Sequence, residues 1–418
     1  QALGAIRASS GIEVAAALLE DPSPQVQAAA CLALGGLGAT STAGAVAAKL
    51  GVEGVRCAAI RALAELGPEA SGPHAGEIVA RGIADPDMQT RGEAVAALSL
   101  LDAAHAQAVV GELSRLLKSQ EPAVRASAAL GLGSVGAGGV APDGALAALA
   151  ELLEDSAEDL TWMPLQVGGG ACREPMAMRK PRCAALVSLG SLRAESYAGA
   201  IAGLLEDEDW EVRFCALEAL GCMDARDKAD KVAALMDDDT YPVRAKACAV
   251  LGVLGAEQEV DKMSEMLQDS AQTVRTEAII ALAGMGEAAQ QYSAEVAKLL
   301  GDSSNNVRAA AVRTLVGFGD VGRPYAGVIA KLLYDPQPEV RAEVCGALGA
   351  MGSHGAAFAE DVAGALEDPS GETRAAAAEA LGRMGAEAAP FAAQLRQLAA
   401  DPDPAVVRAA ARALGGGE

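Results

Sequence analysis

The chain has 418 residues, of which 51% are hydrophobic but only 3% aromatic, and its formal net charge is −23. β-branched and aromatic residues are too sparse for a sheet protein, and no apolar run approaches the roughly 20 residues of a membrane-spanning helix. The acidic balance disfavours contact with nucleic-acid phosphates. We therefore expect a helical protein whose partners are proteins, with no nucleic acid and no direct membrane insertion.

A short motif recurs along the chain, and its fullest copy is Asp335-Pro-Gln-Pro-Glu-Val-Arg341. Asp precedes Arg by six positions, Val stands just before the Arg, and Leu-Gly follows seven residues after it. From Arg213 onward, successive motif arginines are 31, 31, 33, 33 and 33 residues apart. Copies at the two ends are weaker, with Gln27 in place of the first Arg and the last Arg displaced to Arg408. Internal repetition of this period predicts an array of similar structural units.

Each repeat is predicted to contain two helices. The first ends in a Leu pair such as Leu332-Leu333, and a polar turn beginning at Asp335 follows it. The second helix runs from the Val-Arg to the Leu-Gly, and its Gly residues are expected to end it with positive φ. Its apolar residues recur at helical spacing: Val340, Val344, Ala347, Leu348 and Met351.

One irregularity interrupts the array between Asp155 and Arg182, where the usual six-residue step becomes 27 residues. The extra segment spans 157–181. Long insertions in repeat proteins often form loops on a binding face, whereas the alternative is a loop that is merely tolerated. Aromatic, Met and basic side chains are typical interface anchors, so this loop is predicted to bind a partner. The candidate contacts are Trp162, Met163, Met176, Met178, Arg179 and Lys180.

The motif resembles HEAT repeats, most closely the short, alanine-rich kind named after phycobilisome lyases, which has an armadillo-type fold. The resemblance covers essentially all of 1–418. It implies one all-α, right-handed α-solenoid of about twelve helix pairs. Because the chain begins inside a repeat and ends just after a second helix, without capping units, we expect it to be part of a longer array.

In arrays of this kind, the motif Asp and Arg residues typically form a ladder of hydrogen bonds along the stack. Their recurrence in nearly every unit favours this structural role, because a catalytic site needs one unique constellation. No catalytic residue is therefore assigned to them. The predicted ladder contains Arg213, Arg244, Arg275, Arg308, Arg341 and Arg374 with Asp207, Asp238, Asp269, Asp302, Asp335 and Asp368.

Other candidate chemistry is weak. Two GxGxxG matches, at 131–136 and 317–322, follow predicted helices, whereas a dinucleotide site needs that turn after a strand. The three histidines lie in different units and lack the His-Glu pairs that carry iron in deoxyhypusine hydroxylase, an enzyme of similar repeats. The eight cysteines include no CxxC pair and are interpreted as small buried residues in an intracellular, reducing compartment. No cofactor and no metal site are predicted.

The sequence therefore favours a non-catalytic scaffold, or a structural subunit of a stable multi-subunit complex. It is predicted to bind proteins through a concave face lined by the second helices and through the 157–181 loop. The alternative is a bilin lyase or a chaperone-like enzyme, as the name of the repeat would imply. Candidate contacts on the second helices are Arg61, Glu93, Glu218, Lys246, Glu277, Arg313, Glu343 and Glu379.

Overall fold

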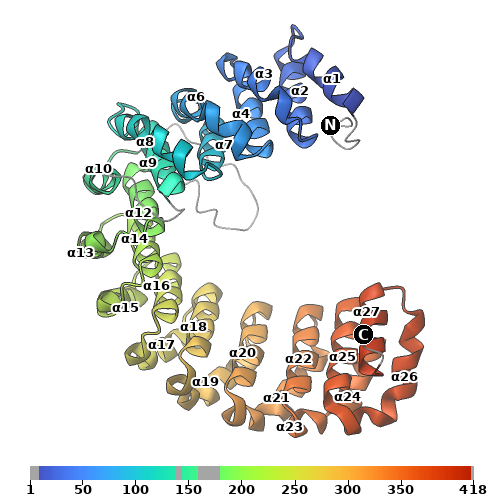
Figure 1. Ribbon diagram of the computed structural model, residues 1–418. Helices are drawn as coiled ribbons and strands as arrows, with labels where there is room; N and C mark the ends of the chain where they lie inside the picture. The colour runs from blue at the N-terminus through green and yellow to red at the C-terminus, as the bar shows by residue number, and fades with distance from the viewer. Residues whose placement is uncertain (1–8, 137–143, 159–178, 416–418) are drawn as a thin grey trace. The chain divides into compact units, whose positions relative to one another are not determined.

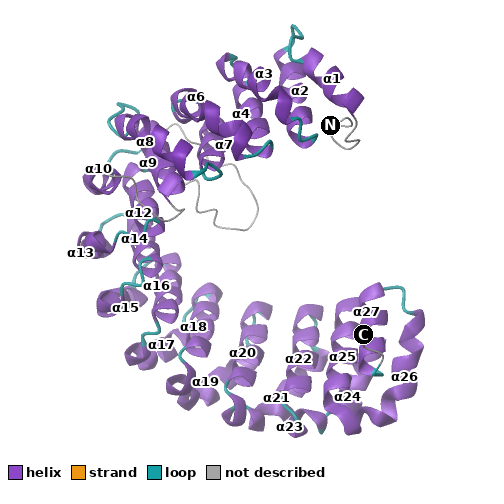
Figure 2. Ribbon diagram, in the orientation of Figure 1, coloured by secondary structure: helices purple, strands orange, loops and turns teal. Residues whose placement is uncertain are grey.

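The computed structural model describes residues 9–136, 144–158 and 179–415, and within them it consists of helices and turns without a β-strand (Figure 2). The predicted all-α solenoid of helix pairs is confirmed. The chain divides into two compact units, Gln1–Ala225 and Arg226–Glu418, here called unit 1 and unit 2. Each is described by itself, although the sequence indicated one array over 1–418.

Unit 1 contains six helix pairs among its described residues. A short helix α5 (Pro68–Ser71) precedes the third pair, and a π-helical segment, Ile78–Ile83, continues α6. The first helices are α1 (Ser9–Leu18), α3 (Ala43–Ala47), α6 (Ala75–Glu77), α8 (Ala103–Leu116), α10 (Ala145–Glu151) and α13 (Ala198–Gly203). The second helices are α2 (Pro24–Gly36), α4 (Arg56–Glu65), α7 (Met88–Leu98), α9 (Pro122–Gly136), α12 (Pro181–Ser191) and α14 (Trp210–Cys222).

Unit 2 contains six further pairs among its described residues, and its second helices lie side by side in chain order (Figure 1). The first helices are α15 (Ala229–Ala234), α17 (Val260–Glu265), α19 (Ser293–Lys298), α21 (Ala326–Ala330), α24 (Ala359–Gly364), preceded by α23 (Ser353–Ala356), and α26 (Ala392–Gln397). The second helices are α16 (Tyr241–Leu254), α18 (Gln272–Gly284), α20 (Asn305–Gly317), α22 (Pro338–Ala350), α25 (Gly371–Met384) and α27 (Pro404–Ala413).

The repeat around α22 shows how the motif folds. Helix α21 tightens into a 3₁₀ turn at Lys331–Tyr334, and Asp335 follows in an extended conformation. Pro338 opens α22 at a position where a helix needs no N–H donor. The side chains of Val340 and Leu348 are fully buried, so the predicted apolar face forms the core between neighbouring repeats.

The two glycines at the end of the motif have different roles. Gly349 lies inside α22, where a Cβ atom would stand 2.8 Å from the Cα of Ala380 on α25. Only glycine allows the two backbones to approach this closely. Gly352 has a φ of 60° and begins the next segment. The prediction that both glycines end the helix with positive φ is therefore right only for Gly352.

Candidate partner-binding surfaces and the ion-pair ladder

The motif Arg and Asp form a regular ladder in which each Arg joins two repeats. Arg308 donates from Nε and Nη2 to both carboxylate oxygens of Asp335, each at 2.7 Å. Its Nη1 donates to the backbone carbonyl of Asp302, in its own repeat, at 2.9 Å. Asp335 also accepts the N–H of Gln337 at 2.9 Å and so shapes its own turn. One Arg–Asp bond, called a rung below, therefore orders two turns and connects their repeats.

The same bidentate rung recurs with N–O distances of 2.7–3.1 Å. In unit 2 it joins Arg244 to Asp269, Arg275 to Asp302, Arg341 to Asp368 and Arg374 to Asp401, and in unit 1 it joins Arg125 to Asp155. Arg182 bonds Asp207 through Nη1 at 2.5 Å, and Arg56 pairs with Asp85. Arg213 donates to the carbonyl of Asp207 at 2.8 Å, and Asp238 accepts the N–H of Thr240 at 2.8 Å.

The rungs hold their carboxylates in the charged form. Burial alone would raise the pKa of Asp335, but the guanidinium of Arg308 and the N–H of Gln337 outweigh it, so the pKa lies below its ordinary value. At Asp368 the hydrogen bond from Arg341 is the largest influence, and it too lowers the pKa. A charge-assisted bidentate bond of this kind is stronger than a neutral hydrogen bond.

The ladder is less regular in unit 1. Gln27 takes the place of the first motif Arg and donates to the carbonyl of Asp21 at 2.7 Å. In the next repeat the buried side chain of Leu50 stands where other repeats have Asp. Its backbone carbonyl accepts from Nε of Arg56 at 2.7 Å. A rung between these two repeats would join positions 27 and 50, and Gln27 and Leu50 replace its Arg and its Asp.

The ends of the 157–181 insertion are tied into the array by an ion-pair cluster. Arg179 donates to both carboxylate oxygens of Glu211 at 2.7 Å and pairs with Glu158 at 2.6 Å. Lys180 pairs with Asp209 and Glu211. The side chains of Arg179 and Lys180 are only 18% and 12% exposed.

Both basic side chains are therefore paired within the chain and largely buried, and their predicted contact with a partner stays a prediction. The cluster is hard to predict from the sequence, since Asp209 and Glu211 belong to an acidic stretch that resembles a solvated surface. The other predicted contacts of the loop, Trp162, Met163, Met176 and Met178, lie outside the described residues. Their role stays a prediction.

The second helices of unit 2 present an exposed face on which charges pair across neighbouring helices. Arg313 on α20 bonds Glu343 on α22 at 2.7 Å, and Glu379 on α25 lies 3.6 Å from Arg412 on α27. On α18, burial raises the pKa of the Glu277 carboxyl. The positive charge of Lys246 on α16 lowers this pKa, but its effect is smaller than that of burial. Several of the predicted contact residues are therefore neighbours in space.

Two large apolar side chains are exposed on the same face. Val253 on α16 is 70% exposed and Ile280 on α18 is 51% exposed. The two helices cross closely at Gly252 and Ala281, where a Cβ on the glycine would stand 2.9 Å from the Cα of Ala281. Val253 directly follows Gly252, and Ile280 directly precedes Ala281. Because each residue of a helix is rotated by about 100° from the last, both side chains point to the same side of the helix pair. We call Val253, Ile280 and the charged residues around them the second-helix face.

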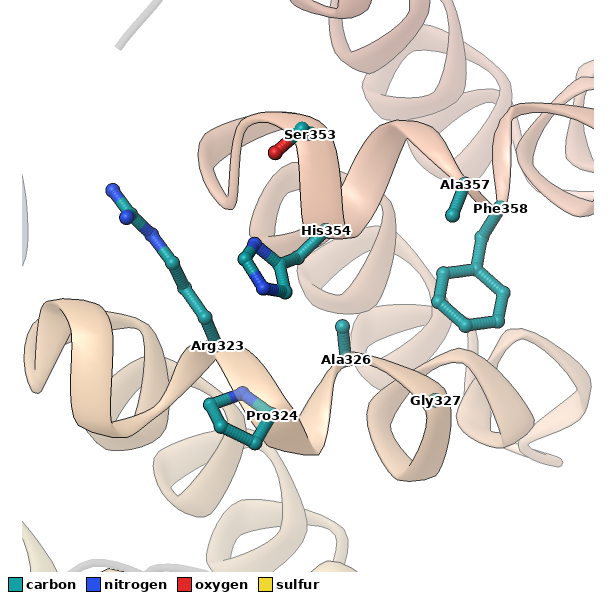
Figure 3. Close-up of a pocket in the computed structure, with 8 residues that line it drawn as sticks. All are labelled: Arg323, Pro324, Ala326, Gly327, Ser353, His354, Ala357 and Phe358. Carbon is teal, nitrogen blue, oxygen red and sulfur yellow. The ribbon is translucent and has the colours of Figure 1, made fainter.

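A depression of about 390 Å³ lies between the first helices of two neighbouring repeats of unit 2. Figure 3 shows Arg323 and His354 at one end and Phe358 at the other, with Ala326 between them. No motif in the sequence marks this depression. Its basic residues come from two repeats and do not recur, because Ala356 and Glu387 stand at the positions equivalent to Arg323 and His354 in the repeats that follow.

The described residues contain no group of three or more His, Cys, Asp or Glu side chains that could hold a metal ion. Within the same ranges, no helix combines the length and apolar character needed to cross a membrane. The cysteines described are free thiols, and most are buried. Burial raises the pKa of Cys248 to about 12, which makes its thiolate inaccessible at neutral pH.

These features define an α-solenoid built from paired helices and bound together by repeated Arg–Asp rungs. The sequence pattern of HEAT repeats matches most of the chain, and the chain belongs to this family. The matched residues are 12–84, 76–162, 178–252, 229–296, 260–326, 293–359 and 359–416. No curated protein is significantly similar in sequence.

Several solved structures share the fold. A crystal structure of importin beta has 14% identity and a TM-score of 0.65, and the match covers 96% of this chain and 62% of that one. A structure of the Kap95:Nup1 complex gives 15% identity, a TM-score of 0.67, and coverage of 96% and 61%. A structure of the karyopherin Kap121p bound to the extreme C-terminus of the protein phosphatase Cdc14p has 13% identity and a TM-score of 0.55. That match covers 89% of this chain and 45% of the other. The chain thus spans less than two thirds of each of these proteins, and the likeness concerns the fold alone.

Proposed function

We propose that this protein is a non-catalytic scaffold, a subunit of a larger protein assembly, that binds a partner through the second-helix face of unit 2. The observation that carries the proposal is the exposure of Val253 and Ile280 side by side within a charged surround. Large aliphatic side chains at the centre of a polar rim are typical of protein interfaces.

Lys246 and Glu277, on the same two helices, carry opposite charges, which fits a partner whose surface is apolar at its centre and polar at its edge. Arg313 and Glu343 already neutralise each other, as Glu379 and Arg412 can, so the face imposes no strong charge requirement. Such exposed pairs contribute little stability in the free protein and can be rearranged at low cost. The HEAT-repeat fold supports this function, because it is typically a non-catalytic surface for other proteins.

The test is a pull-down with the full chain, followed by mass spectrometry of the captured proteins. The Val253→Asp/Ile280→Asp variant should lose the main partner, because two charges would be buried at the centre of the interface. Val14→Asp in unit 1 makes the same kind of change at a side chain that is 52% exposed, and it should keep the partner. Equal capture by all three proteins would contradict the proposal, and a pigment that co-purifies would favour the bilin-lyase alternative.

A further inference from the structure

A second docking site is suggested by the depression on the first-helix side of unit 2, which combines a basic end with an apolar floor. Its walls are Arg323 and Pro324 from the repeat of α21, and His354 and Phe358 from the next repeat. Ala326, Gly327 and Ala357 form a floor of small residues. The small floor leaves room for a side chain, and the ring of Phe358 offers it an apolar wall.

Exposed apolar residues also adjoin the lining residues in sequence. Val321 lies two positions before Arg323 and Val328 directly follows Gly327, and both are exposed. Exposed apolar residues that gather beside a depression mark interaction sites more often than residues scattered singly.

The charge of the residues that line the depression indicates that a partner bound there would carry a negatively charged group. Unit 2 has 28 acidic and 18 basic residues, so its formal net charge is −10, yet the depression itself is lined by Arg323 and His354 and by no acidic residue. Asp320 pairs with Nη1 of Arg323, but its side chain is 86% exposed and it occupies only part of the guanidinium. The remaining N–H donors of the guanidinium, and a ring nitrogen of His354, can bind a carboxylate.

We propose that this depression binds an acidic segment of a partner protein, with an apolar side chain held between Ala326, Ala357 and Phe358 and an adjacent carboxylate held by Arg323 and His354. The inference rests on the proposed scaffold function and adds a second contact surface, with its own chemistry, to it.

The probe is a fluorescein-labelled peptide of nine residues with Phe between two Glu in a Gly-Ser background, and its binding to the full chain is followed by fluorescence anisotropy. It should bind at least about tenfold more tightly than the same peptide with Lys for Glu, or with Ala for Phe. Weaker discrimination, or no binding, would overturn the proposal.

Two variants separate the basic end from the apolar floor. Arg323→Glu should weaken binding about tenfold or more, whereas Arg396→Glu, the same change on exposed α26, should leave it unchanged. Gly327→Leu fills the floor without changing charge. A Cβ there would lie 3.5 Å from Cζ of Phe358, an ordinary contact, so this variant should melt no lower than the parent and still lose the peptide.

Peptide binding that survives Gly327→Leu would show that the depression is not the site. The pull-down distinguishes this failure from failure of the scaffold function. If the Gly327→Leu chain and the parent capture the same partners, the depression is not a contact surface, but the scaffold function stands. If the parent captures no partner at all, the scaffold function fails, and the peptide experiment still decides what the depression binds.

Discussion

The two units of the chain use the same repeat but connect their repeats differently. In unit 2, five consecutive bidentate rungs run from Arg244 to Asp401. In unit 1, Gln27 and Leu50 replace both members of one rung, and the Asp position that follows Arg91 holds Ser119. Arg91 still donates to the backbone carbonyls of Asp85 and Pro86, at 2.9 and 2.8 Å.

The comparison separates two roles of the motif. The bond from Arg to the carbonyls of its own turn persists at Arg91, where the motif Asp of the next repeat is replaced by Ser119, so this bond does not depend on that Asp. The rung adds the connection between repeats. Because the stability of a solenoid is approximately the sum of its repeats and their nearest-neighbour interfaces, unit 2 should be the more strongly coupled array.

Acid should have the largest effect on the difference in coupling between the two units, because it protonates the carboxylates of all rungs at once. The folded-state pKa values of Asp269, Asp302, Asp335, Asp368 and Asp401 are lowered. A carboxyl whose pKa is lower in the folded state stabilises the fold above its unfolded pKa, near 4, and loses this contribution as pH falls through the folded value. Unit 2 should therefore lose stability below about pH 4.

Urea denaturation at pH 7, 4 and 3 measures this loss. Both tryptophans, Trp162 and Trp210, belong to unit 1, so their fluorescence follows unit 1 while circular dichroism follows both units. The pH-dependent shift should be larger in the circular dichroism transition than in fluorescence. Asp335→Asn should reduce the pH dependence of unit 2, and an unchanged dependence would contradict the role of the rungs.

Removal of one rung should have the next largest effect. Arg308→Ala leaves Asp335, whose side chain is 3% exposed, without its bidentate partner. Loss of one member of a buried ion pair costs about 3 kcal/mol or more. Arg313→Ala on the same helix removes an exposed pair and should cost less than about 1 kcal/mol. Equal urea midpoints for the two variants would mean that the rungs do not couple the repeats.

A pair of glycines on α22 tests the close packing of second helices in unit 2. Gly349→Ala places a methyl group 2.8 Å from the Cα of Ala380 and should destabilise unit 2 by about 1–3 kcal/mol. Gly346→Ala meets no atom within 4 Å, so it should stabilise the helix by up to about 1 kcal/mol. Thermal melts of the two variants should shift in opposite directions. A melting temperature of Gly349→Ala that does not fall would show that α22 and α25 can separate enough to admit a methyl group.

The fold could be predicted well from the sequence because each repeat determines its own helices and turn through residues that are close in sequence, and the same pattern recurs along the chain. The spacing of Val340, Val344 and Leu348 defines a helix face, and the turn from Asp335 to Pro338 defines where that helix begins. The register of the rungs was harder to predict, because the Asp that Arg341 binds is Asp368, in the next repeat, and not Asp335, whose carbonyl it also contacts.

The candidate surfaces were predicted less well, because they depend on contacts between repeats. Arg179 and Lys180 looked like exposed loop anchors until their packing against Glu211 was known. The depression at Arg323 and His354 joins residues about 30 positions apart, and no motif marks them. Val253 and Ile280 occupy different motif positions, so only the crossing of α16 and α18 shows that they share a face.

The smallest expected effect comes from giving unit 1 a rung of the kind found in unit 2. Ser119 stands where most other repeats have Asp, and its hydroxyl already accepts the N–H of Glu121 at 3.2 Å. Ser119→Asp keeps an acceptor for this turn and adds a carboxylate at the motif position that Asp335 occupies in the rung with Arg308. Because Arg91 is buried, a new carboxylate beside it would lose much of its hydration, which offsets most of the attraction, so the gain should be modest. Ser119→Asn supplies a similar acceptor without the charge and is the matched control. The fluorescence-detected urea midpoint of unit 1 should rise for Ser119→Asp, rise less at high salt, and stay unchanged for Ser119→Asn. If the Asn variant gains as much as the Asp variant, turn geometry explains the gain, and the difference in coupling between the two units must have another cause.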